Sequence, residues 1–276
     1  MSYINITENE FLSFVKFMQE QYGINLTQKK NLIAGRLQNY LRMNSFDSFS
    51  ELYDKVVQDK SGEMVTLLLN KLTTNHTYFL REIEHYNYFK DIVLPYIVKS
   101  DTMQKFDARI WSAGCSSGEE AYCIAMYLAD YFKHHREKWD KKILATDISE
   151  KVLSTAFEGK YLSEHLDVLP KEWRANYFKT VDDAYSQVKE QIRQEVIFRK
   201  FNLMEEKFPF KNKFHIIWCR NVMIYFDTPT KIKLINKFYE HTEPGGFLFI
   251  GHSESIQKGE TKYRYVMPAI YRKEMN

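Results

Sequence analysis

The sequence predicts a doubly wound α/β domain with a mostly parallel sheet, preceded by a small all-helical module. From about residue 106 onwards, helical patterns alternate with strand-like runs: FDARIWSA, KKILATDI, FHIIWCRN and GGFLFIGH. This alternation is typical of parallel strands joined by crossover helices. Before residue 106 the apolar residues recur at helical spacing and no strand pattern appears. We place the helical module at residues 1–70 and the α/β domain at residues 71–276.

The composition is that of a globular protein with a sizeable core. The chain has 276 residues, of which 44% are hydrophobic and 16% aromatic, and its formal net charge is +3. So mild a charge argues against a nucleic-acid partner. Apolar runs fall far short of the roughly 18 residues of a membrane span, and MSYINITENE lacks the layout of a signal peptide. We expect a cytoplasmic protein that does not insert into membranes, and we expect it to be a monomer.

The cysteines and histidines predict neither disulfides nor a metal site. The three cysteines form no CxxC pair, and the eight histidines form no HExxH motif. So few cysteines fit a reducing compartment. We therefore expect no metal.

The helical module begins with a well-marked helix. Thr7 and Glu10 have the spacing of a capping box, and Gly23 ends the helix. The apolar residues between them fall on one face: Phe11, Phe14, Val15, Met18 and Tyr22. We expect Thr27 to cap a second helix, and further helical patterns run through FSELYDKVV and GEMVTLLLNKL.

A segment from about residue 157 to residue 197 interrupts the alternation of strands and helices. In YFKTVDDAYSQVKEQIRQEVIF, β-prone patches flank an acidic turn at Asp182 and Asp183, which predicts a small antiparallel insert. A long amphipathic helix from about Tyr185 to Arg193 fits the same residues equally well. Both interpretations stay open on the pattern alone.

A turn of small residues, WSAGCSSGEEAY, joins the first predicted strand to the helix EEAYCIAMYLADYF. A loop in this position lies at the carboxyl edge of the sheet, where such folds bind nucleotides, and small side chains let a ligand approach the backbone. A tight turn without a ligand is the alternative. The dinucleotide fingerprint GxGxxG is absent, and the carboxylates of Glu119 and Glu120 disfavour a pyrophosphate. The turn therefore favours a ligand that carries positive charge.

A second signal is Asp147, at the end of the predicted strand ILATD. In nucleotide-binding α/β folds an acidic residue in this position accepts hydrogen bonds from ribose hydroxyls. The alternative is a capping role for Asp147 at the start of the helix SEKVLSTAF. Together with the loop, Asp147 indicates adenosine with a cationic tail. This describes S-adenosylmethionine, which has a ribose, an ammonium and a sulfonium but no phosphate, and whose product is S-adenosylhomocysteine.

Five segments resemble the CheR-type chemotaxis receptor methyltransferases: TTNHTYFLRE, WSAGCSSGEEAY, ATDIS, CRNVMIYFD and GGFLFIGHSES. The resemblance runs over nearly the whole chain, including the helical module. It implies a Rossmann-like S-adenosylmethionine methyltransferase domain that methylates glutamate side chains of methyl-accepting chemotaxis receptors for adaptation. Leu80, Ala121 and Cys123 depart from the family's usual phenylalanine, proline and serine. We expect these departures to change packing and to leave cofactor binding intact.

The resemblance also implies the cofactor contacts, which are Asn75, Thr77, Arg81, Glu120, Asp147, Asn202, Leu203, Arg220 and Asn221. Among these, Glu120 would meet the methionine end of the cofactor and Asp147 the ribose. Asn202 and Leu203 would lie on the adenine side. Spacing does not decide between Glu119 and Glu120 for the ammonium, and Glu120 is our choice.

Arg81 and Tyr225 are the expected catalytic residues, because the family pattern brings them closest to the transferred methyl group. A glutamate carboxylate has a pKa of about 4.3 and is already ionised at neutral pH, so this acceptor needs no general base. A hydroxyl and a guanidinium therefore suffice. Without the resemblance, Arg81 would be interpreted as an interdomain surface salt bridge and Tyr225 as a core tyrosine.

The stretch from Gln21 to Phe46 contains no acidic residue and suits acidic receptor helices. Its basic residues are Lys29, Lys30, Arg36 and Arg42. An ordinary solvated surface is the alternative. In some members of the family the antiparallel insert grips a tethering peptide of the receptor, and the short acidic turn argues against that here. Two other functions remain: a methyltransferase acting on a small molecule or RNA, and a signalling module that binds the cofactor without turnover.

Overall fold

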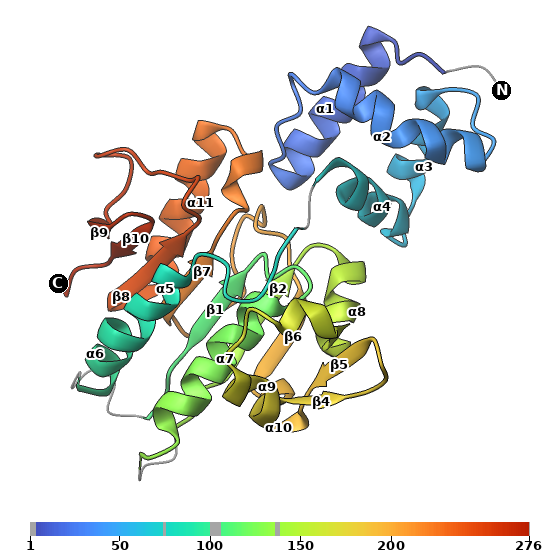
Figure 1. The fold of residues 1–276 in the computed structure, drawn as a ribbon. Coiled ribbons are helices and arrows are strands. Elements are labelled where there is room, and N and C mark those ends of the chain that lie inside the picture. Colours follow the sequence, from blue (N-terminus) through green and yellow to red (C-terminus); the bar gives the residue numbers. More distant parts are fainter. Residues whose placement is uncertain (1–3, 74–75, 100–105, 136–138, 276) are drawn as a thin grey trace.

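The computed structural model describes residues 4–73, 76–99, 106–135 and 139–275. The described part of the N-terminal module is helical and packs beside the sheet (Figure 1, blue to teal). These helices are α1 (Glu8–Tyr22), α2 (Lys30–Met43), α3 (Phe49–Gln58) and α4 (Glu63–Leu72). The predicted helical module is thus confirmed as a fold, while its boundary at residue 70 stays a prediction. None of the described helices is long and apolar enough to span a membrane.

The caps of the first two helices differ in how well the sequence predicts them. The Thr7 side chain accepts a hydrogen bond from the Glu10 N–H at 3.3 Å, and the Glu10 carboxylate accepts one from the Thr7 N–H at 2.8 Å. That capping box is confirmed, as is the helix end at Gly23. The predicted cap at Thr27 is wrong, because the N-cap position of α2 is Lys29, and the Thr27 N–H and hydroxyl donate to the Asn25 side chain. Helix α2 begins later, without a side-chain cap.

A mixed seven-stranded sheet forms the centre of the α/β domain, in the order β6-β2-β1-β7-β8-β10-β9. Its first five strands are parallel, and β10 and β9 are added antiparallel at one edge. The strands are β1 (Ile110–Ala113), β2 (Ile143–Asp147), β6 (Val196–Lys200), β7 (Phe214–Cys219), β8 (Thr242–Ile250), β9 (Arg264–Met267) and β10 (Ile270–Arg272). The mostly parallel sheet is confirmed, and β6, β9 and β10 are additions to the predicted strands.

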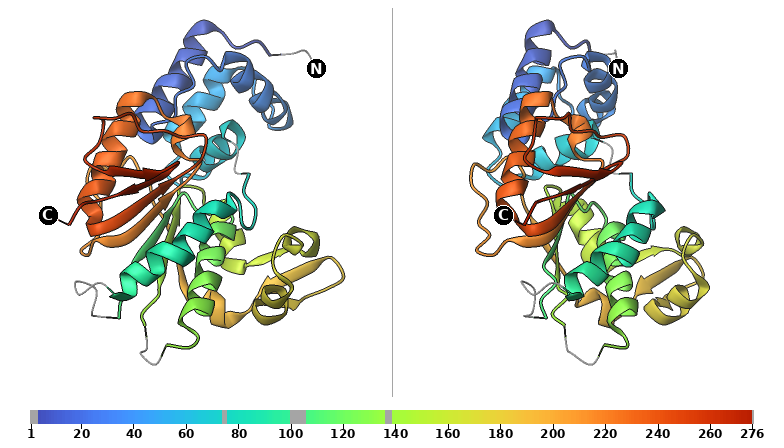
Figure 2. Two further views of the ribbon diagram at one scale, coloured as in Figure 1. Left: turned by 60° about the vertical axis from the view of Figure 1, so that its left-hand side comes forward. Right: turned by 90° about the vertical axis from the view of Figure 1, so that its left-hand side faces the viewer.

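Helices cover both faces of this sheet (Figure 2, right). On one face lie α5 (Ile83–Tyr88), its π-helical continuation η1 (Phe89–Val93), α6 (Leu94–Lys99) and α7 (Glu119–Phe132), against strand residues such as Ile110 and Trp218. On the other lies α11 (Thr228–His241), against the alternate residues Trp111 and Ile217. The buried residues of the helical module belong to this second cluster, so the module and the α11 face share one core.

Between β2 and β6 the chain forms helix α8 (Glu150–Glu158) and then a small antiparallel sheet in the order β3-β5-β4. Its elements are β3 (Lys160–Leu162), η3 (Ser163–Leu166), α9 (Lys171–Tyr177), β4 (Phe178–Thr180), β5 (Tyr185–Val188) and α10 (Glu190–Arg193). The antiparallel insert is therefore confirmed, and the long helix over residues 185–193 is wrong. The Asp182 carboxylate accepts hydrogen bonds from the N–H groups of Ala184 and Tyr185, and this turns the chain back into a strand.

Candidate active site

A cavity opens at the carboxyl ends of β1, β2 and β7, where the helical module meets the α/β domain. The space between its walls is about 1080 Å³, with the open solvent at its mouth included. Nine of the predicted site residues line it: Thr77, Arg81, Glu120, Asp147, Asn202, Leu203, Arg220, Asn221 and Tyr225. Asn75 lies outside the described residues. Segments far apart in the sequence thus meet at the edge where parallel strands end.

The loop after β1 is shaped by its own fold. Gly114 has a φ of 85°, and a Cβ at this position would lie 2.4 Å from a methyl carbon of Val222. The N–H groups of Gly114 and Cys115 both donate to the Thr146 carbonyl, at 2.7 and 2.9 Å. Glycine is therefore required at position 114 both by the positive φ and by the space that Val222 occupies. That a ligand also needs this bare backbone stays a prediction.

Asp147 braces the same loop from the end of β2. Its carboxylate accepts hydrogen bonds from the Ser116 N–H at 2.9 Å and the Ser149 N–H at 3.0 Å. Ser149, and not Asp147, is the N-cap residue of α8. Burial raises the pKa of Asp147, and these N–H groups act in the opposite direction. Its position in the cavity wall leaves Asp147 suited to accept hydrogen bonds from a ligand.

The two adjacent carboxylates of α7 have different surroundings. Glu119 is buried and accepts a hydrogen bond from the Ser117 hydroxyl at 2.7 Å, away from the cavity. Glu120 lines the cavity and accepts hydrogen bonds from the Ser112 hydroxyl at 2.7 Å and from Arg220 at 3.2 Å. Burial raises the pKa of Glu120, and Arg220 and Ser112 lower it in part. This geometry favours Glu120 over Glu119 as the group that faces a ligand.

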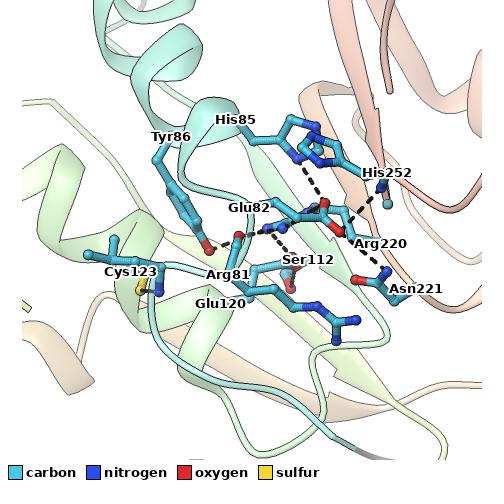
Figure 3. A network of polar contacts seen from close by, with 12 residues as sticks. Arg81, Glu82, His85, Tyr86, Ser112, Glu120, Cys123, Arg220, Asn221 and His252 are labelled. Atoms are coloured by element: carbon cyan, nitrogen blue, oxygen red, sulfur yellow. Dashed lines mark hydrogen bonds and ion pairs between the residues drawn. The ribbon is translucent and has the colours of Figure 1, made fainter. Parts of the chain in front are cut away.

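Arg220 is held between two carboxylates at the wall of the cavity (Figure 3). Its side chain is 2% exposed, and it lies 3.0 Å from the Glu82 carboxylate and 3.2 Å from that of Glu120. It also donates to the Arg81 carbonyl at 2.5 Å, and its guanidinium lies over the Tyr86 ring. The contact of Arg220 with Glu82 was not expected from the sequence, although Glu82 stands within the motif TTNHTYFLRE.

The two expected catalytic residues lie on opposite segments of the cavity wall. Arg81 donates to the His76 carbonyl at 2.8 Å, and its guanidinium lies 5.8 Å from the centre of the Tyr78 ring. Arg81 forms no ion pair with any residue that the structure describes, so the surface salt bridge is wrong. Tyr225 is half-buried in the short helix η4 (Met223–Tyr225) and lines the cavity. It is therefore not a core tyrosine.

Residues of the helical module complete the wall, and the sequence analysis did not identify them. They are Tyr22, Ile24 and Leu69. The Asn202 side chain, expected near adenine, donates to the Gln21 carbonyl at 2.8 Å and so holds the module against the domain. Apolar residues look alike in a sequence whether they face a core or a cavity, so no sequence signal separates these three.

Comparison with known proteins identifies the family of the chain. The SAM-binding domain of the CheR methyltransferases matches residues 75–271, and their all-alpha domain matches residues 9–73. The chain belongs to the CheR methyltransferase family. The predicted fold class is thereby confirmed: an all-helical domain precedes an S-adenosylmethionine-binding methyltransferase domain that carries a small antiparallel sheet.

Two curated CheR relatives span nearly the same length. A chemotaxis protein methyltransferase of Borreliella burgdorferi is 44% identical over 98% of this chain and 96% of its own. The chemotaxis protein methyltransferase 2 of Vibrio cholerae is 34% identical over 94% of this chain and 89% of its own. Among solved structures, the glycopeptide N-methyltransferase MtfA with S-adenosyl-L-methionine aligns at a TM-score of 0.32 and 14% identity, over 52% of this chain and 46% of its own. That similarity is too low to bear on function.

Two of the departures from the usual CheR residues contact each other. The Leu80 N–H donates to the sulfur of Cys123 at 3.3 Å. Ala121 is fully buried in α7. The contact between Leu80 and Cys123 therefore joins the segment that carries Arg81 to the helix that carries Glu120. A serine hydroxyl at position 123 would accept the same hydrogen bond, so the replacement conserves this contact.

One group of side chains in the described residues has the composition of a metal site. Glu82, His85 and His252 bring their ligand atoms within 4.8 Å of one another. The Glu82 carboxylate is already paired with Arg220, whose positive charge would repel a metal cation. Burial, together with Arg220, lowers the pKa of His85 to about 3, so the ring is neutral at ordinary pH. This group is better explained as a support for Arg220.

Proposed function

We propose that this chain transfers a methyl group from S-adenosylmethionine to the side-chain carboxylates of glutamates on methyl-accepting chemotaxis receptors. The observation that carries the proposal is membership of the CheR family over nearly the whole chain. The names of its relatives, chemotaxis protein methyltransferases, support a receptor as the acceptor. The product would be a glutamyl methyl ester, which serves chemotactic adaptation.

The side chains of the cavity fit S-adenosylmethionine. Asp147 would accept hydrogen bonds from the ribose hydroxyls, and Glu120 would accept them from the ammonium. Leu203 and Asn202 would flank the adenine. The remaining contacts would come from Asn75, Thr77, Arg81, Arg220 and Asn221. When bound, the cofactor supplies a methyl group attached to a sulfonium, which is a reactive leaving group.

Methyl transfer to a carboxylate mainly requires the protein to align the reacting groups. A glutamate carboxylate is already ionised at neutral pH, so no residue has to remove a proton. The one thiol in the cavity wall, Cys115, is buried, and burial raises its pKa, which keeps it protonated. Tyr225 and Arg81 would position the acceptor oxygen in line with the methyl carbon and the sulfur. Positioning of this kind contributes on the order of 7 kcal/mol or more.

We propose that exposed basic residues at the two ends of α2 help to dock the acidic receptor helices. Two of the four basic residues have structural partners, because Lys30 pairs with Glu8 at 2.6 Å and Arg36 donates to the Lys71 and Thr73 carbonyls. Lys29 and Arg42 are exposed. Their replacement by glutamate should therefore weaken receptor binding more than Lys55→Glu on the neighbouring helix α3. Equal binding of all three variants would reassign α2 as an ordinary solvated surface.

The experiment that tests the proposed reaction uses the purified protein, cofactor labelled in its methyl group, and membranes that bear chemoreceptors. We expect label on the receptors and S-adenosylhomocysteine in equal amount. Cofactor binding without any turnover would indicate a sensing module instead. Label on RNA or on a small molecule, with none on the receptors, would indicate a methyltransferase with another acceptor. Sedimentation of the purified chain tests the expected monomer.

A further inference from the structure

We propose that Glu82 determines how strongly the cavity prefers the cationic cofactor over its product, and that it acts through Arg220. Glu82 is not among the residues that line the cavity. The inference rests on the proposed cofactor, because it concerns the charge that methyl transfer removes. S-Adenosylmethionine carries a sulfonium, an ammonium and a carboxylate, for a net charge of +1. S-Adenosylhomocysteine has an uncharged thioether and a net charge of zero.

The arrangement of charges around Arg220 is the first observation. Nη2 of Arg220 lies 3.0 Å from Oε2 of Glu82, and Nη1 lies 3.2 Å from Oε2 of Glu120. The two carboxylates and the guanidinium together carry a charge of −1. Without Glu82, Arg220 would cancel the charge of Glu120, and this part of the wall would be neutral. Glu82 therefore supplies the negative charge that is left over for a cationic ligand.

The ionisation of Glu82 follows from its surroundings. Burial by itself raises the pKa of this carboxyl, but Arg220 and the His252 N–H lower it by more, so that the pKa lies below its usual value. The neighbouring His85 ring is neutral and adds no second positive charge. Because the Glu82 side chain is 13% exposed and that of Arg220 is 2% exposed, water screens this charge little.

The backbone fixes Glu82 in place. Glu82 has a φ of 57°, and Leu80 and Asn221 have φ values of 57° and 58°. Non-glycine residues seldom adopt this left-handed conformation, and they keep it where the surrounding structure holds them. The Glu82 carboxylate also accepts a hydrogen bond from the His252 N–H at 3.2 Å and faces the Asn221 amide at 3.4 Å. It thus joins three segments behind the cavity wall.

The consequence is a difference between two ligands. When the Glu82 charge is lost, Arg220 neutralises the charge of Glu120. The contact between Glu120 and the ligand ammonium then weakens equally for the cofactor and for the product. This effect leaves the ratio of cofactor Kd to product Kd unchanged. Only the cofactor carries a sulfonium. The weaker attraction between the cavity wall and the sulfonium therefore raises the cofactor Kd without raising the product Kd. Glu82 is therefore a specificity-determining residue that limits how strongly product competes with cofactor.

The test is calorimetry on the full chain with S-adenosylmethionine, S-adenosylhomocysteine and sinefungin, in which an ammonium-bearing carbon replaces the sulfonium. Glu82→Gln removes the charge and keeps the shape, Glu82→Asp keeps the charge, and Glu84→Gln changes an exposed carboxylate nearby as a control. In Glu82→Gln, the ratio of cofactor Kd to product Kd should rise several-fold, because a unit negative charge is lost at a site that water screens little. Sinefungin should follow the cofactor.

Glu82→Asp and Glu84→Gln should keep the wild-type ratio. Equal weakening of all three ligands by Glu82→Gln would overturn the inference and leave Glu82 a structural support. If Glu82→Gln does not fold, a changed ratio in the charge-conserving Glu82→Asp would overturn it as well. Failure of the wild-type chain to bind any of the three ligands would instead overturn the proposed function on which the inference rests.

Discussion

The backbone N–H of Asn25 donates to the carbonyl oxygen of Tyr225 at 2.8 Å. Next to this bond, Ile24 and Phe226 form an antiparallel bridge. The segment that follows α1 therefore holds the loop that carries the expected catalytic tyrosine. Ile24 and Tyr225 also face the same cavity, so the helical module is part of the candidate site.

Gly23→Ala should disturb this junction. Gly23 has a φ of 69°, and a Cβ there would lie 2.5 Å from the Met204 sulfur. We expect a loss of unfolding free energy of about 1 kcal/mol or more and weaker cofactor binding. Gly35→Ala on α2 is the matched control, because nothing lies within 4 Å of its Cβ position. It should stabilise the helix by up to about 1 kcal/mol. Urea denaturation and calorimetry of both variants measure the contrast, and identical behaviour would contradict it.

Asp147→Ala should weaken binding of S-adenosylmethionine on the order of tenfold or more, because charge-assisted hydrogen bonds to the ribose would be lost. The variant also removes the acceptor for the N–H groups of Ser116 and Ser149. Its unfolding therefore has to be measured alongside calorimetry. Asp183→Ala changes an exposed carboxylate and serves as the control. Unchanged affinity in Asp147→Ala would remove this residue from the site.

Arg81→Ala should lower turnover far more than stability. The Arg81 guanidinium contacts the His76 carbonyl and the Tyr78 ring, and these half-exposed contacts contribute little to folding. Steady-state kinetics and thermal unfolding separate the two effects, with Arg174→Ala, which breaks a surface ion pair with Asp167, as the comparison. A variant that melts several degrees early but keeps full activity per folded molecule would give Arg81 a structural role.

The unfolding free energy should fall between pH 7 and pH 5, in part through His215. This residue is 3% exposed, its Nδ1 faces the Arg109 N–H at 3.0 Å, and burial with Arg109 lowers its pKa to about 4. The pKa in the unfolded chain is about 6.5, so the unfolded state binds more protons in this window and stability is lost as pH falls.

The expected slope from His215 approaches 1.4 kcal/mol per pH unit below about pH 6. His215→Gln should flatten the pH dependence measured by urea denaturation, whereas His134→Gln, at an exposed position, should leave it unchanged. The same slope in both variants would assign the effect to other groups.

The sequence predicted those parts of the site that stand at strand ends. Asp147 ends β2, and its place at the carboxyl edge of the sheet follows from the strand pattern, whereas Arg220, directly after β7, was expected only from the resemblance to the CheR family. The role of Glu82 depends on its contact with Arg220, 138 residues further along the chain, and no spacing rule indicates such a contact. The cap at Thr27 was wrong because the Asn25 side chain holds Thr27 in a turn and α2 begins only after Lys29.

In the fold, too, local helical patterns were predictable from the sequence, whereas pairing between distant segments was not. Long amphipathic patterns predicted α1 and α7 well, because one buried face repeats over several turns. The insert was ambiguous because β5 spans only Tyr185–Val188 and is followed at once by a helical turn. Its pairing with β3 and β4, which the pattern does not contain, decides its conformation.

The most direct test of the proposed reaction is the stability of its product to alkali. After transfer of labelled methyl groups to chemoreceptor-bearing membranes, a glutamyl methyl ester should release the label as volatile methanol in mild base. N-methyl products and ether O-methyl products survive the same treatment. We predict that nearly all of the protein-bound label becomes volatile and that it maps to glutamate side chains by mass spectrometry. Label that stays on protein or nucleic acid after alkali would contradict carboxylate methylation, even if S-adenosylmethionine binds in the cavity.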